Sequence, residues 1–323
     1  MQKYLTILSA ITMCLIMASD NSNSSETKQA APPTSVELAE SRTNFATMLN
    51  QSHPGNRIGY RFHEHQPFAY GPVPDDAKSA GLDPAAADKL EAEYASRPGV
   101  FVNRREVREE VWVPQDWTYY FVPVGDGFDL LWVITTFDSG INEYYSVQQC
   151  FRMSGGTNEE WRQKIALTPA FSEYDLWAEQ ERQGKEMTSL SYVRRNGKWE
   201  ALPAIREHVL CHTPLGIEMD TKRCDGNIEA ITQDNPYGPS LLQPSVDCGL
   251  MTRSTLDDTW VCGLYWEGTT HITNHHPADC LHPFVNLGPI PPHGKRVIRG
   301  KIYWMEASKA GLYEHWKRDF GEK

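Results

Sequence analysis

The sequence predicts a mainly β protein, a large antiparallel β-sandwich with a few peripheral helices, and three observations predict it. From about residue 109 the chain becomes a succession of segments rich in aromatic and β-branched residues, which favour strands. Turn sequences such as GDG and DSGIN separate these segments. Strand segments do not alternate with helical ones and the sequence has no Gly-rich phosphate loop, which disfavours a nucleotide-binding α/β fold.

The N-terminal residues predict export of the chain. Residues 1–19 have a Lys near the start, an apolar run and a small residue at the end, as in a secretory signal peptide, and the run is too short for a transmembrane helix. Residues 20–35 are polar and contain Pro, which predicts a disordered linker. Residues 36–323 are expected to form a single β-sandwich domain with a helical N-terminal segment. The protein is therefore expected to be secreted or periplasmic, without a lipid anchor.

The first half of the domain contains both helix and strand signals. Ser35 as a possible N-cap, with glutamates soon after it, predicts a short helix within residues 35–50. Residues 57–74 are expected to form a strand that runs into a Pro/Gly loop. The pair Asp83-Pro84 followed by good helix formers predicts a second helix over residues 84–96.

The middle of the chain is predicted to be a β meander. Its strand segments are 110–124, 128–137, 143–153 and a hairpin over 189–203 with an Asn196-Gly197 turn. Alternation in the third segment places Tyr144, Ser146 and Gln148 on a face suited to lining a groove. Residues 205–250 are irregular in pattern, with short strands expected near 205–212 and 243–252.

The C-terminal part carries the densest polar chemistry. Strands are expected over residues 258–268 and 295–306, joined by a loop over 269–294, and an amphipathic helix over 308–320 is expected to pack on a sheet. Five of the eleven histidines and two of the seven cysteines lie between residues 258 and 306. We therefore expect the functional site in this region.

Composition narrows the class of partner. A formal net charge of −11 argues against nucleic acid as a partner. Ten Trp and fourteen Tyr suit stacking on sugar rings, and they suit the packing of a β core equally well. The six cysteines beyond the signal peptide allow up to three disulfides, with Cys211 to Cys224 as the first pairing to expect, or else buried free thiols.

The strand over residues 295–306 has two different faces. Alternation puts Ile298, Ile302 and neighbouring apolar residues on one face, and Arg299, Lys301 and Tyr303 on the other. An arginine can clamp a carboxylate with two hydrogen bonds, so this second face is a candidate site for an acidic sugar. The alternative is a solvated face with cross-strand charge partners.

The histidines of this region allow three interpretations. They are His271, His275, His276, His282 and His293. With Asp279 and Cys280 among them, they could bind zinc, although their spacing matches no defined zinc motif. A neutral histidine could also act as general acid or base, or could simply hydrogen-bond to the backbone of the loop.

The last part of the chain contains the strand end WEG, the Cys-Leu-His-Pro segment, RGKIYW and the closing LYEHWKRDF. Over these residues, about fifty in all, the sequence resembles secreted bacterial β-sandwich proteins of the galactose-mutarotase-like kind. Within this part of the chain, Thr273-Asn274-His275 and Phe284-X-Asn286-Leu287 resemble the two halves of an aldose 1-epimerase motif. In this chain eight residues separate the halves, and the motif lies near the C-terminus instead of mid-chain.

The resemblance implies a supersandwich whose concave face binds a sugar. It implies His275 as general acid and a carboxylate, Glu267 or Glu306, as base. In lyases built on related sandwiches a Tyr or His removes a proton beside a neutralised uronate carboxylate, and Tyr303 or His282 would take that role here.

The sequence thus favours a secreted carbohydrate-active protein with lyase or epimerase chemistry on an acidic or neutral sugar. The expected catalytic residues are His275, His282, Tyr303 and Glu267. The residues expected to bind the sugar are Arg299, Lys301, Trp266, Asn274 and His271. No cofactor is expected, and the alternatives are a carbohydrate-binding protein without catalysis and a zinc-binding protein that uses the segment 271–282.

Overall fold

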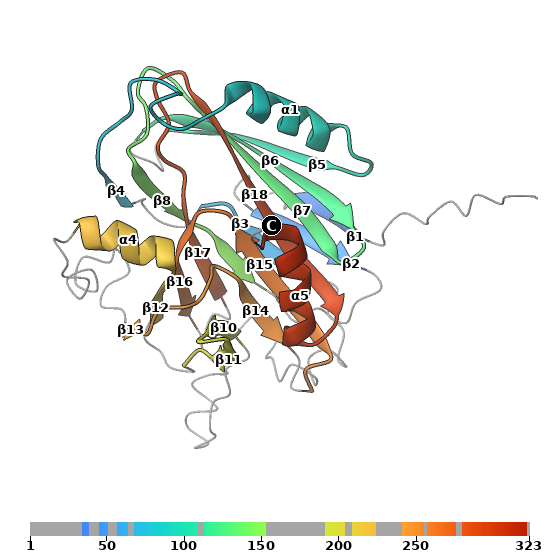
Figure 1. Ribbon diagram of the computed structural model, residues 1–323. Helices are drawn as coiled ribbons and strands as arrows, with labels where there is room; N and C mark the ends of the chain where they lie inside the picture. Colours follow the sequence, from blue (N-terminus) through green and yellow to red (C-terminus); the bar gives the residue numbers. More distant parts are fainter. Residues whose placement is uncertain are drawn as a thin grey trace, which may run out of the picture. The chain divides into compact units, whose positions relative to one another are not determined.

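Two large β-sheets form the fold (Figure 1). The computed structural model describes residues 34–38, 45–50, 57–63, 68–108, 113–152, 191–203, 209–223, 241–254, 257–275 and 280–321, all within the unit Pro32–Lys323. The prediction of a mainly β sandwich is confirmed. The predicted signal peptide lies outside the described residues, and export of the chain stays a prediction.

The first sheet, sheet A, has ten strands among the described residues, in the order β1-β2-β3-β9-β17-β16-β12-β13, with β8 beside β17 and β4 beside β8. Its strands are β1 (Thr34–Leu38), β2 (Phe45–Asn50), β3 (Arg57–Arg61), β4 (Phe68–Tyr70), β8 (Tyr144–Gln148), β9 (Cys150–Arg152), β12 (Val209–His212), β13 (Leu241–Gln243), β16 (Thr269–His275) and β17 (Cys280–Asn286). The pair of β12 and β13 is parallel, and the other described pairs are antiparallel.

The second sheet, sheet B, has eight described strands in the order β11-β10-β14-β15-β18-β7-β6-β5, and every pair is antiparallel. Its strands are β5 (Phe101–Val107), β6 (Gln115–Val124), β7 (Gly127–Thr136), β10 (Ser191–Arg195), β11 (Lys198–Ala201), β14 (Met251–Ser254), β15 (Trp260–Trp266) and β18 (Lys295–Glu306). The predicted Asn196-Gly197 turn joins β10 to β11, and both of its residues have positive φ, as such a turn requires.

The core lies between the two sheets and is rich in aromatic side chains. Apolar residues from both sheets form one buried cluster, with Ile58 and Val147 from sheet A and Trp132 from sheet B among them. Gly300 of β18 lies against the ring of Trp266, where a Cβ atom would come within 2.4 Å of ring atom Cε3. This is the close approach that a glycine in a central strand permits.

Helices cover the outer face of sheet B, as Figure 1 shows. Helix α1 (Pro84–Ala95) begins after Asp83, whose carboxylate accepts hydrogen bonds from two backbone N–H groups, and it contacts β18, β6 and β7. Helix α5 (Lys309–Phe320) begins after the N-cap Ser308 and lies against β15. The sequence predicted α1 from its Asp83-Pro84 start and α5 from its amphipathic pattern. Among the described residues, no helix is both long and apolar enough to span a membrane.

Three local predictions were wrong. The segment predicted as a short helix within residues 35–50 contains β1 and β2, which pair with each other, and β2 also pairs with β3. The expected loop over 269–294 contains the paired strands β16 and β17. Helix α4 (Pro214–Arg223) lies in the stretch predicted to be irregular. In each case pairing or packing with distant parts of the chain outweighs weak local signals.

The predicted Cys211–Cys224 disulfide is also wrong. Cys211 is a buried free thiol, and Cys150, Cys248 and Cys262 are free as well. Burial raises the pKa of the Cys211 thiol to about 11, so it remains protonated at neutral pH.

A buried charge network attaches α5 to sheet B. The Nζ atom of Lys301 lies 2.9 Å from Oδ1 of Asp126 and 2.9 Å from Oδ2 of Asp319, and Lys301 is only 6% exposed. The hydroxyl of Tyr303 donates to the same oxygen of Asp319 over 2.9 Å. One cation therefore neutralises carboxylates from a β-turn and from a helix.

We predict that Lys301→Met lowers the free energy of unfolding by about 2–4 kcal/mol, because it leaves partly buried carboxylates without their cation. Lys317→Met is the matched control. Lys317 forms an exposed pair with Glu314, so its loss should cost at most about 0.5 kcal/mol. Urea unfolding of the two variants measures both values, and equal losses would contradict a structural role for the Lys301 network.

The same network predicts a dependence of stability on acid pH. Burial alone would raise the pKa of Asp126, but Lys301 and His315 outweigh it and hold that pKa below its ordinary value of 3.8. Because the folded pKa is the lower one, the stabilisation is present above about pH 4 and is lost as pH falls through the folded pKa. In Lys301→Met, the free energy of unfolding measured in urea should depend less on pH in this acid range. An unchanged pH dependence would show that Asp126 is not the group that causes the loss of stability in acid.

Candidate functional site

Arg299, Lys301 and Tyr303 lie on the face of β18 that points away from the core, as predicted. Their polar groups already pair with other side chains of the protein. Arg299 donates through Nε and Nη2 to Oε1 of Glu267, over 3.1 and 2.8 Å. Arg299, the expected ligand of a sugar carboxylate, and Glu267, an expected catalytic base, therefore form an ion pair with each other. Tyr303 is fully buried, and burial followed by the nearby Asp319 carboxylate raises its pKa far above the ordinary value, which disfavours the phenolate a base would need.

Two other predicted binding residues face the interior. Trp266 is fully buried between the sheets, and its Nε1 donates to the hydroxyl of Tyr60 over 3.0 Å. Asn274 is 1% exposed and lies two residues after Ile272, a member of the core cluster, so both point to the same side of β16. Neither side chain is available to stack on or bind a sugar at the surface in this arrangement.

Two histidines of the predicted region, His271 and His282, lie on the outer face of sheet A, whereas His293 is exposed in the turn before β18, 3.4 Å from Asp138. His282 lies on β17, where its Nδ1 is 3.1 Å from the hydroxyl of Thr273 on β16, and Gln148 of β8 donates to that hydroxyl over 3.4 Å. His271 lies on the same side of β16 as Thr273. His275 ends β16, but its side chain lies outside the described residues. The structure thus separates the histidines on sheet A from Arg299, Lys301 and Tyr303 on sheet B.

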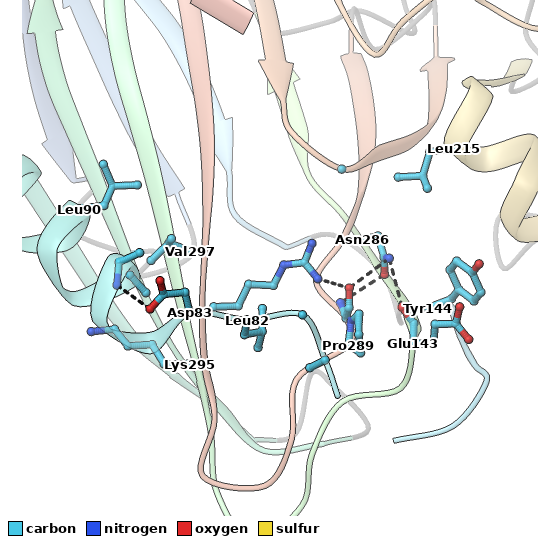
Figure 2. A pocket seen from close by; sticks show the side chains of 17 residues that line it. Leu82, Asp83, Leu90, Glu143, Tyr144, Leu215, Asn286, Pro289, Lys295 and Val297 are labelled. Atoms are coloured by element: carbon cyan, nitrogen blue, oxygen red, sulfur yellow. Dashed lines mark hydrogen bonds between the residues drawn. The ribbon is translucent and has the colours of Figure 1, made fainter. Parts of the chain in front are cut away.

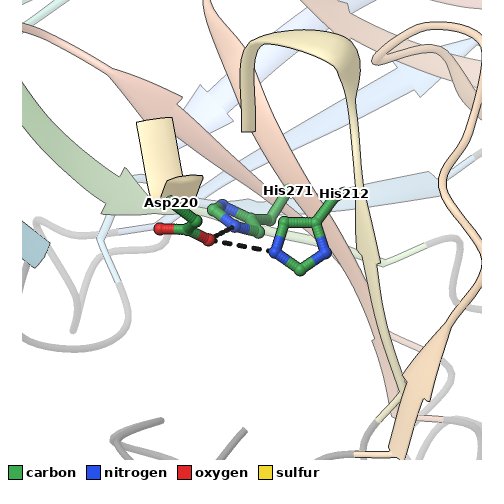
Figure 3. A group of neighbouring side chains, drawn as sticks. All are labelled: His212, Asp220 and His271. Atoms are coloured by element: carbon green, nitrogen blue, oxygen red, sulfur yellow. Dashed lines mark hydrogen bonds and ion pairs between the residues drawn. The ribbon is translucent and has the colours of Figure 1, made fainter. Parts of the chain in front are cut away.

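His271 meets two residues that sequence reasoning missed, His212 and Asp220 (Figure 3). Oδ2 of Asp220 lies 2.7 Å from Nε2 of His271 and 3.0 Å from Nε2 of His212. All three side chains are less than 5% exposed. Figure 3 shows both imidazole rings turned toward the carboxylate, which comes from α4.

The local sequence explains why this cluster forms. His212 ends β12 and stands directly opposite His271 in the β12–β16 pair. Thr213 caps α4 by accepting a hydrogen bond from the N–H of Gly216, and its own hydroxyl donates to carbonyls of β16. A Cβ atom at Gly216 would lie 2.0 Å from the carbonyl oxygen of Thr270, so only glycine lets α4 approach the sheet this closely. Asp220, one turn later on the same side of the helix, then reaches both histidines.

Burial and hydrogen bonding set the charges in the cluster. Burial alone would raise the pKa of Asp220, but hydrogen bonds from His212 and His271 outweigh it and hold that pKa well below its ordinary range. Burial lowers the pKa of His271 despite the adjacent carboxylate. At neutral pH Asp220 is therefore an anion beside a neutral His271. A Thr-Pro pair directly after a strand ending in His was the available sequence signal, because it marks a helix start.

A cavity of about 570 Å³ lies where β18 begins, and it is the second feature with the properties of a site (Figure 2). Figure 2 shows Leu90 and Val297 on one side and Leu215 with Tyr144 on the other. The polar residues of its lining are Asp83, Glu143, Tyr144, Asn286, Lys295 and Arg296. Both nitrogen and oxygen of the Asn286 side chain are engaged by backbone groups, so this residue shapes the wall.

Arg296 differs from the other cationic residue of the cavity because its charge has no carboxylate partner among the described residues. It lies on the same side of β18 as Ile298 and Ile302, so its side chain is partly buried where the core ends. Burial lowers the pKa of its guanidinium, with Glu267 opposing that shift, yet an arginine remains charged at neutral pH. Among the described residues its guanidinium donates to the carbonyl of Gly288, and no carboxylate lies within ion-pair distance.

Lys295, the neighbour of Arg296, is paired with carboxylates. Its Nζ atom forms ion pairs with Asp88, at 2.6 Å, and with Glu91, both on α1. The lysine charge is therefore neutralised within the fold. The arginine charge is left facing the cavity.

Comparison with known proteins gives distant likenesses in structure alone. No family model matches the chain, and no curated protein is similar to it in sequence. Similar solved structures include the Slr1438 protein from Synechocystis sp. PCC 6803, with 8% identity over 64% of this chain and 62% of that chain and a TM-score of 0.31. Another is a candidate aldose 1-epimerase from Escherichia coli K12, with 8% identity over 64% of this chain and 65% of that chain and a TM-score of 0.29.

The chain spans less than two thirds of the length of either structure. At these scores the likeness carries no conclusion about activity.

Proposed function

We propose that the protein binds a small carboxylated carbohydrate in the cavity at the start of β18. The observation that carries this proposal is the partly buried Arg296, which faces the cavity without a carboxylate partner among the described residues. A buried charge without a partner is costly, and an anionic ligand would remove that cost. A guanidinium matches a carboxylate with two parallel hydrogen bonds.

The rest of the lining supports a sugar as the carrier of the carboxylate. A volume of about 570 Å³ falls in the usual range for small-molecule sites, roughly 300–1,000 Å³. The carboxylates of Asp83 and Glu143 can accept hydrogen bonds from hydroxyl groups. Leu82, Leu90 and Val297 offer apolar surface to the C–H faces of a sugar ring. A sugar acid combines these three kinds of group in one small molecule.

Binding without turnover is the form of the proposal that the cavity favours. Among the described residues no histidine lines it, and Tyr303 lies under α5 on the other side of β18. The acid–base chemistry expected from His275, His282 or Tyr303 therefore has no described group in the cavity. Export to the cell exterior or periplasm, if the predicted signal peptide acts, would expose the protein to such sugars.

We predict that the purified chain binds D-glucuronate or D-galacturonate and that Arg296→Gln weakens this binding about 10- to 100-fold. The expected loss corresponds to a charge-assisted bidentate contact. Isothermal titration calorimetry measures the affinities, with the matching neutral sugars, glucose and galactose, as reference ligands. Arg296→Gln should bind the acidic and the neutral sugar with similar affinity.

Arg299→Gln is the matched control, because Arg299 is an arginine of the same strand whose charge is already paired with Glu267. It should bind the acidic sugar as the wild type does. Equal weakening by both substitutions, or a wild type that does not distinguish acidic from neutral sugars, would contradict the proposal. Absorbance by unsaturated product in separate mixtures with a 4-linked polyuronate, whose glycosidic oxygen leaves from C4 as the C5 proton is removed, would add lyase activity to the binding function.

A further inference from the structure

The His212–Asp220–His271 cluster lies outside the cavity lining and has no role in the proposed sugar binding. Its three potential ligand atoms lie within 4.8 Å of one another. Two imidazole nitrogens and a carboxylate oxygen form a common ligand set for divalent first-row metals. A tetrahedral ion with bonds of about 2.0–2.1 Å holds its ligand atoms roughly 3.3 Å apart, so the carboxylate would move outward from the 2.7 and 3.0 Å seen here to admit the ion.

Asp220 is incompletely satisfied by its two histidines. Both imidazoles contact Oδ2, whereas Oδ1 is buried and has no hydrogen-bond partner among the described residues. A buried carboxylate oxygen without a partner costs free energy. A cation beside the carboxylate would offset that cost, so this oxygen is an observation separate from the convergence of the ligands.

Thr270 holds the ring of His271 in place. The hydroxyl of Thr270 donates to the carbonyl of Phe284 over 3.1 Å and lies 3.0 Å from Nδ1 of His271. A partner at the other ring nitrogen orients a metal-binding imidazole, and here Nε2 is directed at Oδ2 of Asp220, 2.7 Å away.

The ligands stand on rigid elements. His212 and His271 are opposite each other in adjacent strands, and the close approach at Gly216 fixes the distance of α4 from them. Such preorganisation is what a metal site requires of its protein. The competing interpretation is a purely structural cluster in which both histidines donate their Nε2–H to Asp220.

We propose that His212, Asp220 and His271 bind one Zn²⁺ ion, which ties α4 to the outer face of sheet A. Three protein ligands leave a fourth position on the ion for water or another ligand. This site differs from the zinc site that the sequence suggested within residues 271–282, because two of its ligands lie outside that segment.

The test is metal uptake by the intact purified chain. After dialysis against EDTA and then against ZnCl₂ with removal of free metal, mass spectrometry of the elements should find one zinc per chain. Cobalt substitution should give the visible absorption bands of a tetrahedral site. A wild-type chain that retains far less than one zinc, or takes up cobalt without these bands, would overturn the proposal without any variant.

Variants locate the ion. Asp220→Asn keeps the shape of the side chain and removes its charge, and it should weaken zinc binding about 100-fold or more. His282→Gln is the matched control, since His282 is an equally buried histidine of sheet A outside the cluster, and it should retain one zinc. Circular dichroism checks that both variants fold. Equal zinc binding by folded Asp220→Asn and wild type would overturn the proposal, as would loss of zinc from His282→Gln alone.

Discussion

The alternation of side chains along β18 is the constraint on which much of the structure depends. This twelve-residue strand lies at the centre of sheet B, between β15 and β7. One side of the strand fills the core and the other is covered by α1 and α5. Whether a residue of β18 is odd- or even-numbered therefore decides which of these two environments it enters. Lys301 and Tyr303, on the covered side, bind Asp319 and so attach α5 to the sheet. Because the strand extends beyond the core at its start, the inward side also carries Arg296 into the cavity, and the candidate binding group follows from the same alternation.

The outer face of sheet A obeys a different constraint, the close docking of α4. Thr213 begins the helix directly after β12, and Gly216 lets it approach β16, which brings Asp220 to two histidines. The two candidate sites share no residue, although α4 contributes Leu215 to the cavity and Asp220 to the histidine cluster. This differs from the single combined site that the sequence suggested.

The sequence predicts those features that depend on neighbours in the chain. The parity of β18, the Asn196-Gly197 turn, the cap of α1 and the amphipathic pattern of α5 are local patterns, and the structure confirms them. The β1–β2 pair, α4 and the β16–β17 pair depend on partners distant in sequence. For the sites, sequence identified suitable residue types, but only the topology shows that Arg299 is paired with Glu267. Arg296 was detectable, because an arginine in phase with Ile298 and Ile302 is unusual on a core-facing side.

A crystal structure of the full chain soaked with D-galacturonate tests the central proposal most directly. Our proposal predicts the sugar in the cavity, with its carboxylate oxygens about 3 Å from the guanidinium nitrogens of Arg296. A sugar bound elsewhere would contradict it. So would a carboxylate from another part of the chain paired with Arg296, because the arginine would then need no ligand to neutralise it.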